Sequence, residues 1–197
     1  MTCDLDGLLK EADTDEHDSE VMIKKEIRVL GISSATPRPK RESLTQVVGV
    51  VYRGNRWLEG VMRTTIRSEA ADLTPKIAKM VTDSPHFPQL RVIALDELIT
   101  KSGRYVDIRA LSKESRLPVI AVLRQKILIK RLSKSLGKFS RRSLKAFAKL
   151  PCRNWTVVGK TFFVYSAGLG NLDLEELLSV CASREGVPEA ARVARIA

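Results

Sequence analysis

The sequence predicts an α/β fold with a mixed sheet, in which a three-strand antiparallel meander is followed by parallel strands with crossover helices. Two apolar segments, 44–53 and 56–66, flank the dipeptide Gly54-Asn55, and this order is typical of a β-hairpin. Downstream, short apolar segments alternate with segments of helical period, which indicates parallel crossovers. A chain of 197 residues, 44% of them hydrophobic, is long enough for one such domain with a buried core.

The first predicted strand spans residues 23–32 and precedes the hairpin of the meander. Residues 33–43 contain two prolines and are expected to form a loop, because proline breaks strand pairing. Ser33 and Ser34 therefore follow the carboxyl end of a strand, where ligands gather in open α/β sheets. These positions carry hydroxyls rather than carboxylates, so the sequence supports a fold and a partner better than a reaction.

Helices and strands alternate through the rest of the chain. A helix starts after Asp72, which is a favourable N-cap, and Pro85 limits its other end. Near the C-terminus, a helix is predicted from an apolar stripe whose members are Leu174, Leu177, Leu178 and Cys181. The further predicted elements are a strand at 90–95, a helix at 107–115, strands at 117–123 and 155–166, the latter broken by a turn at Gly159, and a last helix at 189–196.

Charge divides the chain into an acidic tail, residues 1–22, and a basic domain, residues 23–197. The formal net charge is +11, although residues 1–20 contain eight acidic residues and one basic residue. The remaining residues carry +18, and a fold that basic usually has a polyanionic partner. The tail is expected to be disordered, and it either shields the basic domain as a nucleic-acid mimic or only adds solubility.

The strongest basic signal is the segment 124–153, which contains eleven Lys or Arg residues and no acidic residue. Apolar residues at helical spacing predict a helical pair with one seam and a cationic outer face. This face is either a phosphate-binding surface or a solvated one. Its two phenylalanines lie on the seam, so base stacking is not the expected mode of contact. Structured RNA or DNA, including ribosomal RNA, is therefore a better expected ligand than a single strand. The predicted nucleic-acid-binding residues are Lys126, Lys130, Arg131, Lys134, Lys138, Arg141, Arg142 and Lys145.

Composition argues against several other classes of site. The three cysteines are scattered and the two histidines lie far from them in sequence, so neither a disulfide framework nor a zinc site is expected. No apolar run approaches the ~20 residues that span a bilayer, and the first residues are too acidic for a secretory signal. The chain is therefore expected to be cytoplasmic and to have no membrane partner, and its protein partners are left open.

Five stretches of the sequence carry a resemblance to a known family. They are EIRVLGI at 26–32, VVGVVYRGNRWLEGVM at 47–62, LRVIALD at 90–96, LPVIAV at 117–122 and GVPEAARVARIA at 186–197. On these stretches the chain resembles an archaeal family of uncharacterised proteins that is similar to endonuclease V. The resemblance implies an RNase H-like fold of the endonuclease V type, and a nucleic acid as the partner.

The resemblance also implies a metal site, since enzymes similar to endonuclease V cut phosphodiesters with divalent metal held by carboxylates on adjacent strands. It places an Asp-Asp pair where this chain has Ser33 and Ser34, whose hydroxyls add no negative charge. Family acidic positions match Glu69, Asp72 and Asp96, which form the candidate catalytic set, with Asp96 as the candidate metal ligand. The alternative interpretation is that Asp72 caps a helix and Asp96 caps a loop.

Three functions follow as hypotheses. The first is a catalytically inactive nucleic-acid-binding protein on an endonuclease V-like scaffold with a degenerate metal site, preferring RNA to DNA and requiring no cofactor. The second is an active endonuclease that uses Mg²⁺ or Mn²⁺ at a relocated carboxylate site. The third is a structural subunit of a protein complex or ribonucleoprotein. Glu59, in the Trp-Leu-Glu-Gly segment, is either catalytic or exposed on an edge strand.

Overall fold

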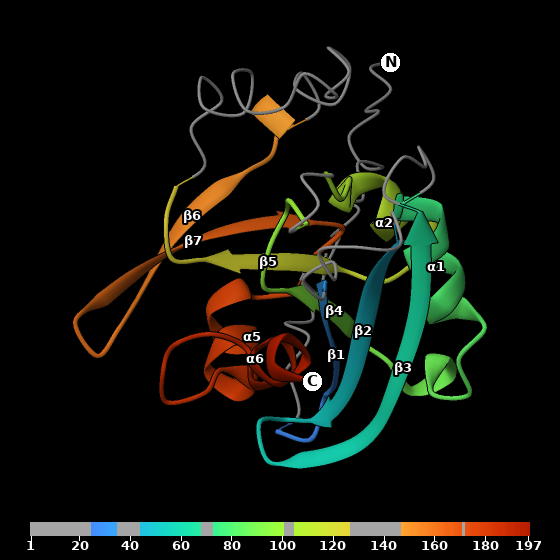
Figure 1. The fold of residues 1–197 in the computed structure, drawn as a ribbon. Coiled ribbons are helices and arrows are strands. Elements are labelled where there is room, and N and C mark those ends of the chain that lie inside the picture. Colours follow the sequence, from blue (N-terminus) through green and yellow to red (C-terminus); the bar gives the residue numbers. More distant parts are fainter. Residues whose placement is uncertain (1–24, 35–43, 68–72, 101–104, 127–146, 171) are drawn as a thin grey trace, which may run out of the picture.

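A mixed seven-stranded sheet with helices on both faces organises the described part of the chain (Figure 1). The computed structural model describes residues 25–34, 44–67, 73–100, 105–126, 147–170 and 172–197. The elements are β1 (Arg28–Ser34), β2 (Leu44–Arg53), β3 (Trp57–Arg67), α1 (Leu73–Thr82), the 3₁₀ turn η1 (Phe87–Gln89), β4 (Val92–Leu95), α2 (Ile108–Ser115), β5 (Val119–Leu123), β6 (Cys152–Val157), β7 (Lys160–Ala167), α5 (Leu174–Cys181) and α6 (Glu189–Ile196). The strand order is β3-β2-β1-β4-β5-β7-β6.

The first three strands form the predicted antiparallel meander. β2 pairs with β1 along the whole of β1 and with β3 along its own length, with one register shift near Val51. Gly54 has a φ of 59° and donates its N–H to the Ile27 carbonyl over 2.8 Å. The turn between β2 and β3 therefore uses a glycine-favoured conformation and is tied to the residue that precedes β1.

Parallel strands extend the sheet from the other side of β1. Val29 lies beside Val92 in the β1–β4 pair, and Ile93 lies beside Val119 in the β4–β5 pair. Asp107 caps α2, because its side chain accepts hydrogen bonds from the N–H groups that open the helix. The β6–β7 hairpin then adds to β5 in antiparallel orientation. The predicted α/β class, a meander followed by parallel strands with crossover helices, is confirmed.

Each face of the sheet has its own apolar core. Leu30 and Ile32 of β1 pack into the core that α1 and α2 cover, whereas Val29 packs into the core that α5 and α6 cover. Figure 1 shows these two helix pairs on opposite sides of the strands. The predicted stripe of α5 is buried, as expected for a helix that covers a sheet.

The end of β1 differs from the prediction. The strand was expected to stop at Ile32, but it continues through Ser34, because Ser33 and Ser34 pair with residues of β2. Ser33 and Ser34 are therefore the last two residues of the strand and do not start a loop.

The basic segment 124–153 is also not helical throughout. Residues 124–126 leave β5 without forming a helix, and Cys152 and Arg153 already belong to β6, where they pair with β7. Residues 1–24 and 127–146 lie outside the described part of the chain, so the acidic tail and most of the predicted basic helices stay predictions. None of the described helices has the length and apolar composition needed to cross a membrane.

Candidate functional site at the carboxyl ends of β1 and β4

The parallel register of β1 and β4 brings four polar side chains together where these strands end. The ladder closes with a hydrogen bond from the Asp96 N–H to the Ile32 carbonyl over 3.4 Å. The next positions of the same register put Ser33 beside Asp96 and Ser34 beside Glu97. We call Ser33, Ser34, Asp96 and Glu97 the serine–acid cluster.

Each serine of the cluster donates a hydrogen bond to the neighbouring carboxylate. Ser33 Oγ donates to Asp96 Oδ2 over 3.1 Å. Ser34 donates to Glu97 Oε1 through both its Oγ and its backbone N–H, the latter over 3.3 Å. The serines are buried and the two carboxylates are half-buried. The hydroxyls therefore occupy lone pairs of both carboxylates without adding any charge.

Ser33 and Ser34 are successive residues of β1, so their side chains leave opposite faces of the sheet. Glu97 and both serines border a pocket of about 10 Å³, whose lining also includes Thr100 and Val106. That volume is about the minimum that one water molecule needs, so the pocket is too small for a nucleotide.

Within the described residues, the serine–acid cluster brings two carboxylates together, those of Asp96 and Glu97. Two cations about 3.5–4 Å apart that bridge a phosphate need several anionic oxygens on the same side. Ser33 and Ser34 add neutral oxygens only, so any further anionic ligand would have to come from outside the cluster. Within the ranges that the structure describes, no group of three or more His, Cys, Asp or Glu side chains is placed to hold a metal ion.

Two of the predicted site residues fall in the described part of the chain. Asp96 belongs to the serine–acid cluster, and Lys126 is exposed three residues after the end of β5. Because Glu69 and Asp72 lie outside the described ranges, the structure does not test whether they lie near Asp96. The predicted residues that lie outside the described ranges are Glu69, Asp72, Lys130, Arg131, Lys134, Lys138, Arg141, Arg142 and Lys145.

Glu59 belongs to an ion-pair network at the opposite end of β1. Its carboxylate lies 2.6 Å from Arg28 Nε and 2.9 Å from Arg53 Nε, and its side chain is 19% exposed. Arg28 is the first residue of β1, whereas the serine–acid cluster is at the last. Glu59 therefore braces the three strands of the meander; it lies on the edge strand β3, as one interpretation expected, but its side chain is half-buried instead of exposed.

Glu97 is the cluster member that sequence reasoning did not select. The signal that identifies it is the register, because Glu97 follows Leu95 by the same two positions that separate Ser34 from Ile32. Register between parallel strands is not visible in a sequence, so the pairing with Ser34 required the structure.

Comparison with protein families gives a match over most of the chain. A family model described as endonuclease dU matches residues 25–197. A UPF0215 protein from Methanothermobacter thermautotrophicus is 36% identical over 180 residues, which cover 88% of this chain and 87% of that protein. A UPF0215 protein from Methanosarcina acetivorans is 32% identical over 184 residues, which cover 91% of this chain and 92% of that protein.

Solved structures show the same fold. A protein of unknown function from Archaeoglobus fulgidus is 24% identical and has a TM-score of 0.71, with 85% of this chain and 94% of that chain covered. Endonuclease V from Ciona intestinalis, in complex with DNA that contains an inosine followed by a ribo-adenosine, is 15% identical with a TM-score of 0.56, covering 85% of this chain and 81% of that chain. The expected likeness to endonuclease V is confirmed at the level of the fold.

Proposed function

The chain belongs to the endonuclease dU family, and from this premise we propose that it binds nucleic acid without cutting it, with structured RNA as its preferred ligand. The observation that carries the proposal is the serine–acid cluster. Where the resemblance places two acids, the chain has two buried hydroxyls that are already hydrogen-bonded to Asp96 and Glu97. Two carboxylates with neutral hydroxyl neighbours lack the charge to hold two cations against a phosphate.

Binding is supported by charge rather than by the cluster. Outside residues 1–20 the chain carries +18, and the eleven basic residues of segment 124–153 have no acidic neighbour within that segment. Lysine and arginine contacts to phosphates give affinity that falls with salt and depends little on sequence. Because few aromatic residues accompany these bases, structured RNA is preferred over a single strand, and ribosomal RNA and structured DNA are the other ligands that this chemistry accepts.

The first prediction concerns cleavage. With Mg²⁺ or Mn²⁺ present, we expect the purified protein to leave end-labelled RNA hairpins intact, together with DNA duplexes containing deoxyuridine or inosine, because the cluster lacks the charge for a metal pair. Denaturing gels of single-turnover reactions, run beside Asp96→Ala, measure this. We expect the two proteins to give the same background.

The family description favours a second candidate, an active endonuclease whose site is built from Asp96, Glu69 and Asp72. Metal-dependent cleavage by the wild-type protein that disappears in Asp96→Ala and in Glu69→Ala would establish that candidate and refute our proposal. Cleavage that persists in both variants would indicate a contaminating nuclease instead.

The second prediction concerns binding. The test variant replaces five basic residues together by glutamate, namely Lys130, Arg131, Lys134, Arg141 and Arg142. We expect it to bind an RNA hairpin more weakly and with a smaller dependence of affinity on salt. Five lost phosphate contacts lower the slope of log K against log salt by about 4. Fluorescence anisotropy between about 50 and 200 mM salt measures both effects.

The matched control for the second prediction is Arg56→Glu, which reverses one exposed charge in the turn between β2 and β3. We expect each single reversal within segment 124–153 to weaken binding more than this control does. Affinity of the wild-type protein that does not change with salt would contradict the proposed electrostatic binding.

A further inference from the structure

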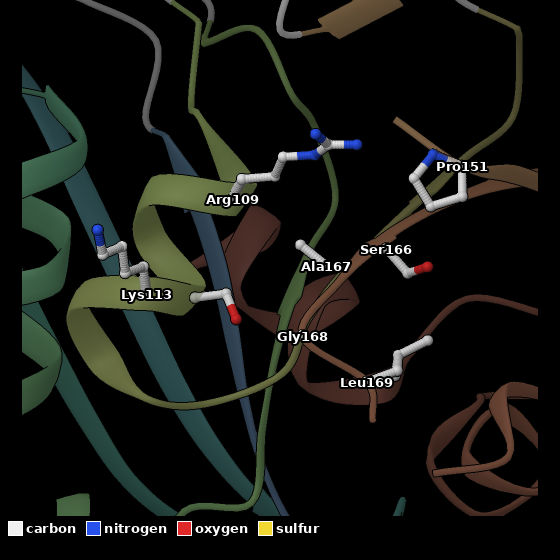
Figure 2. Close-up of a pocket in the computed structure, with 8 residues that line it drawn as sticks. Arg109, Lys113, Pro151, Ser166, Ala167, Gly168 and Leu169 are labelled. Carbon is white, nitrogen blue, oxygen red and sulfur yellow. The ribbon is translucent and has the colours of Figure 1, made fainter. Parts of the chain in front are cut away.

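An open groove lies between α2 and the end of β7 (Figure 2), and its lining shares no residue with the serine–acid cluster. It has a volume of about 510 Å³, and its lining is Arg109, Ser112, Lys113, Pro151, Ser166, Ala167, Gly168 and Leu169. Cavities of about 300–1,000 Å³ are the usual size for sites that hold small organic ligands. We call it the α2–β7 groove.

The groove combines an apolar floor with cationic and hydroxyl groups. Pro151, Ala167 and Leu169 supply apolar surface, and two serines add hydroxyls. Arg109 and Lys113 stand one helical turn apart on α2, and both are exposed. None of the described residues that line the groove is acidic. This is the chemistry that a sugar and base attached to a phosphate require, with apolar contact for the ring and cations for the anion.

Arg109 is held across the groove. Its Nη2 donates to the Lys149 carbonyl over 2.5 Å, and Figure 2 shows its guanidinium reaching from α2 toward Pro151. A guanidinium has several further N–H donors in a fixed planar fork, so this bond orients the group and leaves donors for a phosphate.

Gly168 sets the close approach of the two walls. It has a φ of 69°, and a side chain there would place its Cβ 2.1 Å from Ser112 Oγ. The end of β7 therefore passes directly against α2 at this point, and the groove opens beside the contact. The contact is therefore between the backbone of Gly168 and the side chain of Ser112 on α2.

The groove has lining residues that are close in sequence to both regions that the proposed function concerns. Val106 lines the small pocket of Glu97, and Arg109 follows it by three residues, within the first turn of α2. On the other wall, Lys149 and Pro151 belong to the basic segment, whose Phe147 packs edge-on against Tyr105 with ring centroids 6.0 Å apart.

We propose that the α2–β7 groove binds one nucleotide of the bound nucleic acid, with its phosphate at Arg109 and Lys113 and its sugar and base over Pro151 and Leu169. The inference rests on the proposed function and adds to it a defined site in residues that neither the basic pattern nor the family likeness selects.

The test compares two double variants with the same change of charge. Arg109→Glu with Lys113→Glu is expected to weaken binding of a fluorescein-labelled RNA hairpin at least about tenfold and to lower the salt slope by about 2. The control, Lys25→Glu with Arg56→Glu, reverses two exposed charges near the start of β1 and is expected to weaken binding less than about threefold. Circular dichroism confirms that each variant is folded.

A third variant separates the shape of the groove from its charge. Ala167→Trp fills the groove without altering charge, and we expect it to weaken binding while the salt slope stays unchanged. Equal losses in the two charge variants, or full affinity in Ala167→Trp, would overturn the groove assignment and leave the proposed function standing. A wild-type protein that binds no RNA or DNA would instead refute the proposed function, and the groove assignment with it.

Discussion

Replacing Ser33 and Ser34 together by aspartate is expected to turn the serine–acid cluster into a cation site. Each new carboxylate would face Asp96 or Glu97 across the short distance that a serine hydroxyl now bridges, which is 3.1 Å for Ser33. Without metal, like charges that close repel each other, and the variant should be less stable than the wild-type protein. With Mn²⁺ or Mg²⁺, the paired carboxylates become ligands, and binding should restore that stability.

The size of this effect can be estimated. A ligand at a hundred times its dissociation constant stabilises a protein by about 2.7 kcal/mol. For a chain of this length that corresponds to a rise in Tm of about 5–10 °C. Differential scanning fluorimetry with a Mn²⁺ titration measures the rise, and isothermal titration calorimetry gives the stoichiometry. The wild-type protein should show no comparable rise over the same range.

The control for this experiment is the double variant Ser33→Asn with Ser34→Asn, which matches aspartate in shape but carries no charge. It should not respond to Mn²⁺. An equal rise in the wild-type protein would mean that Asp96 and its present neighbours already hold a cation, which would contradict our account of the cluster. An equal rise in the asparagine variant would mean that the metal binds elsewhere.

The sequence predicted the layers of this fold well because period and turn chemistry are local signals. The Gly54-Asn55 turn and the stripe of α5 both appear in the structure as expected. The predicted end of β1 was wrong by two residues, because the polar residues Ser33 and Ser34 were assigned to the following loop. Their pairing with β2 depends on strand neighbours, which a propensity argument does not include.

The site was less predictable than the fold because it is built from non-local contacts. Asp96 was identified through the resemblance, but its partner Ser33 lies 63 residues away, and the pairing depends on parallel register. Arg109 carried no sequence signal at all, because one exposed arginine on an amphipathic helix is ordinary. Its importance in our proposal comes from the groove that β7 forms beside it.

The C-terminal helix makes the sharpest prediction about stability, because it packs against β1 at a position where only glycine fits. A side chain at Gly31 would place its Cβ 1.9 Å from the Ala190 carbonyl carbon and 2.2 Å from the Ala191 nitrogen. These are backbone atoms of α6, so no rotamer change relieves the overlap. The buried alanines on this face of α6 allow the same close approach from the other side.

Gly31→Ala is therefore expected to move α6 away from the strand that ends in the serine–acid cluster. Overpacking usually costs about 1–3 kcal/mol, and we expect at least about 3 kcal/mol here because backbone must shift. The matched control is Gly49→Ala on β2, where the new Cβ would meet Met62 Cγ at 2.7 Å and that flexible side chain moves aside. It should cost less than about 1.5 kcal/mol.

Urea denaturation of both variants compares their free energies of unfolding, and limited proteolysis near the C-terminus reports whether α6 has detached. If Gly31→Ala were as stable as Gly49→Ala, the close packing of α6 on β1 would be wrong. A compensating Ala190→Gly change is not expected to restore stability to Gly31→Ala, because the overlap is with backbone atoms of α6 and not with the Ala190 side chain. The overlap is relieved only if α6 moves away from β1, and the extent of proteolysis near the C-terminus measures that displacement.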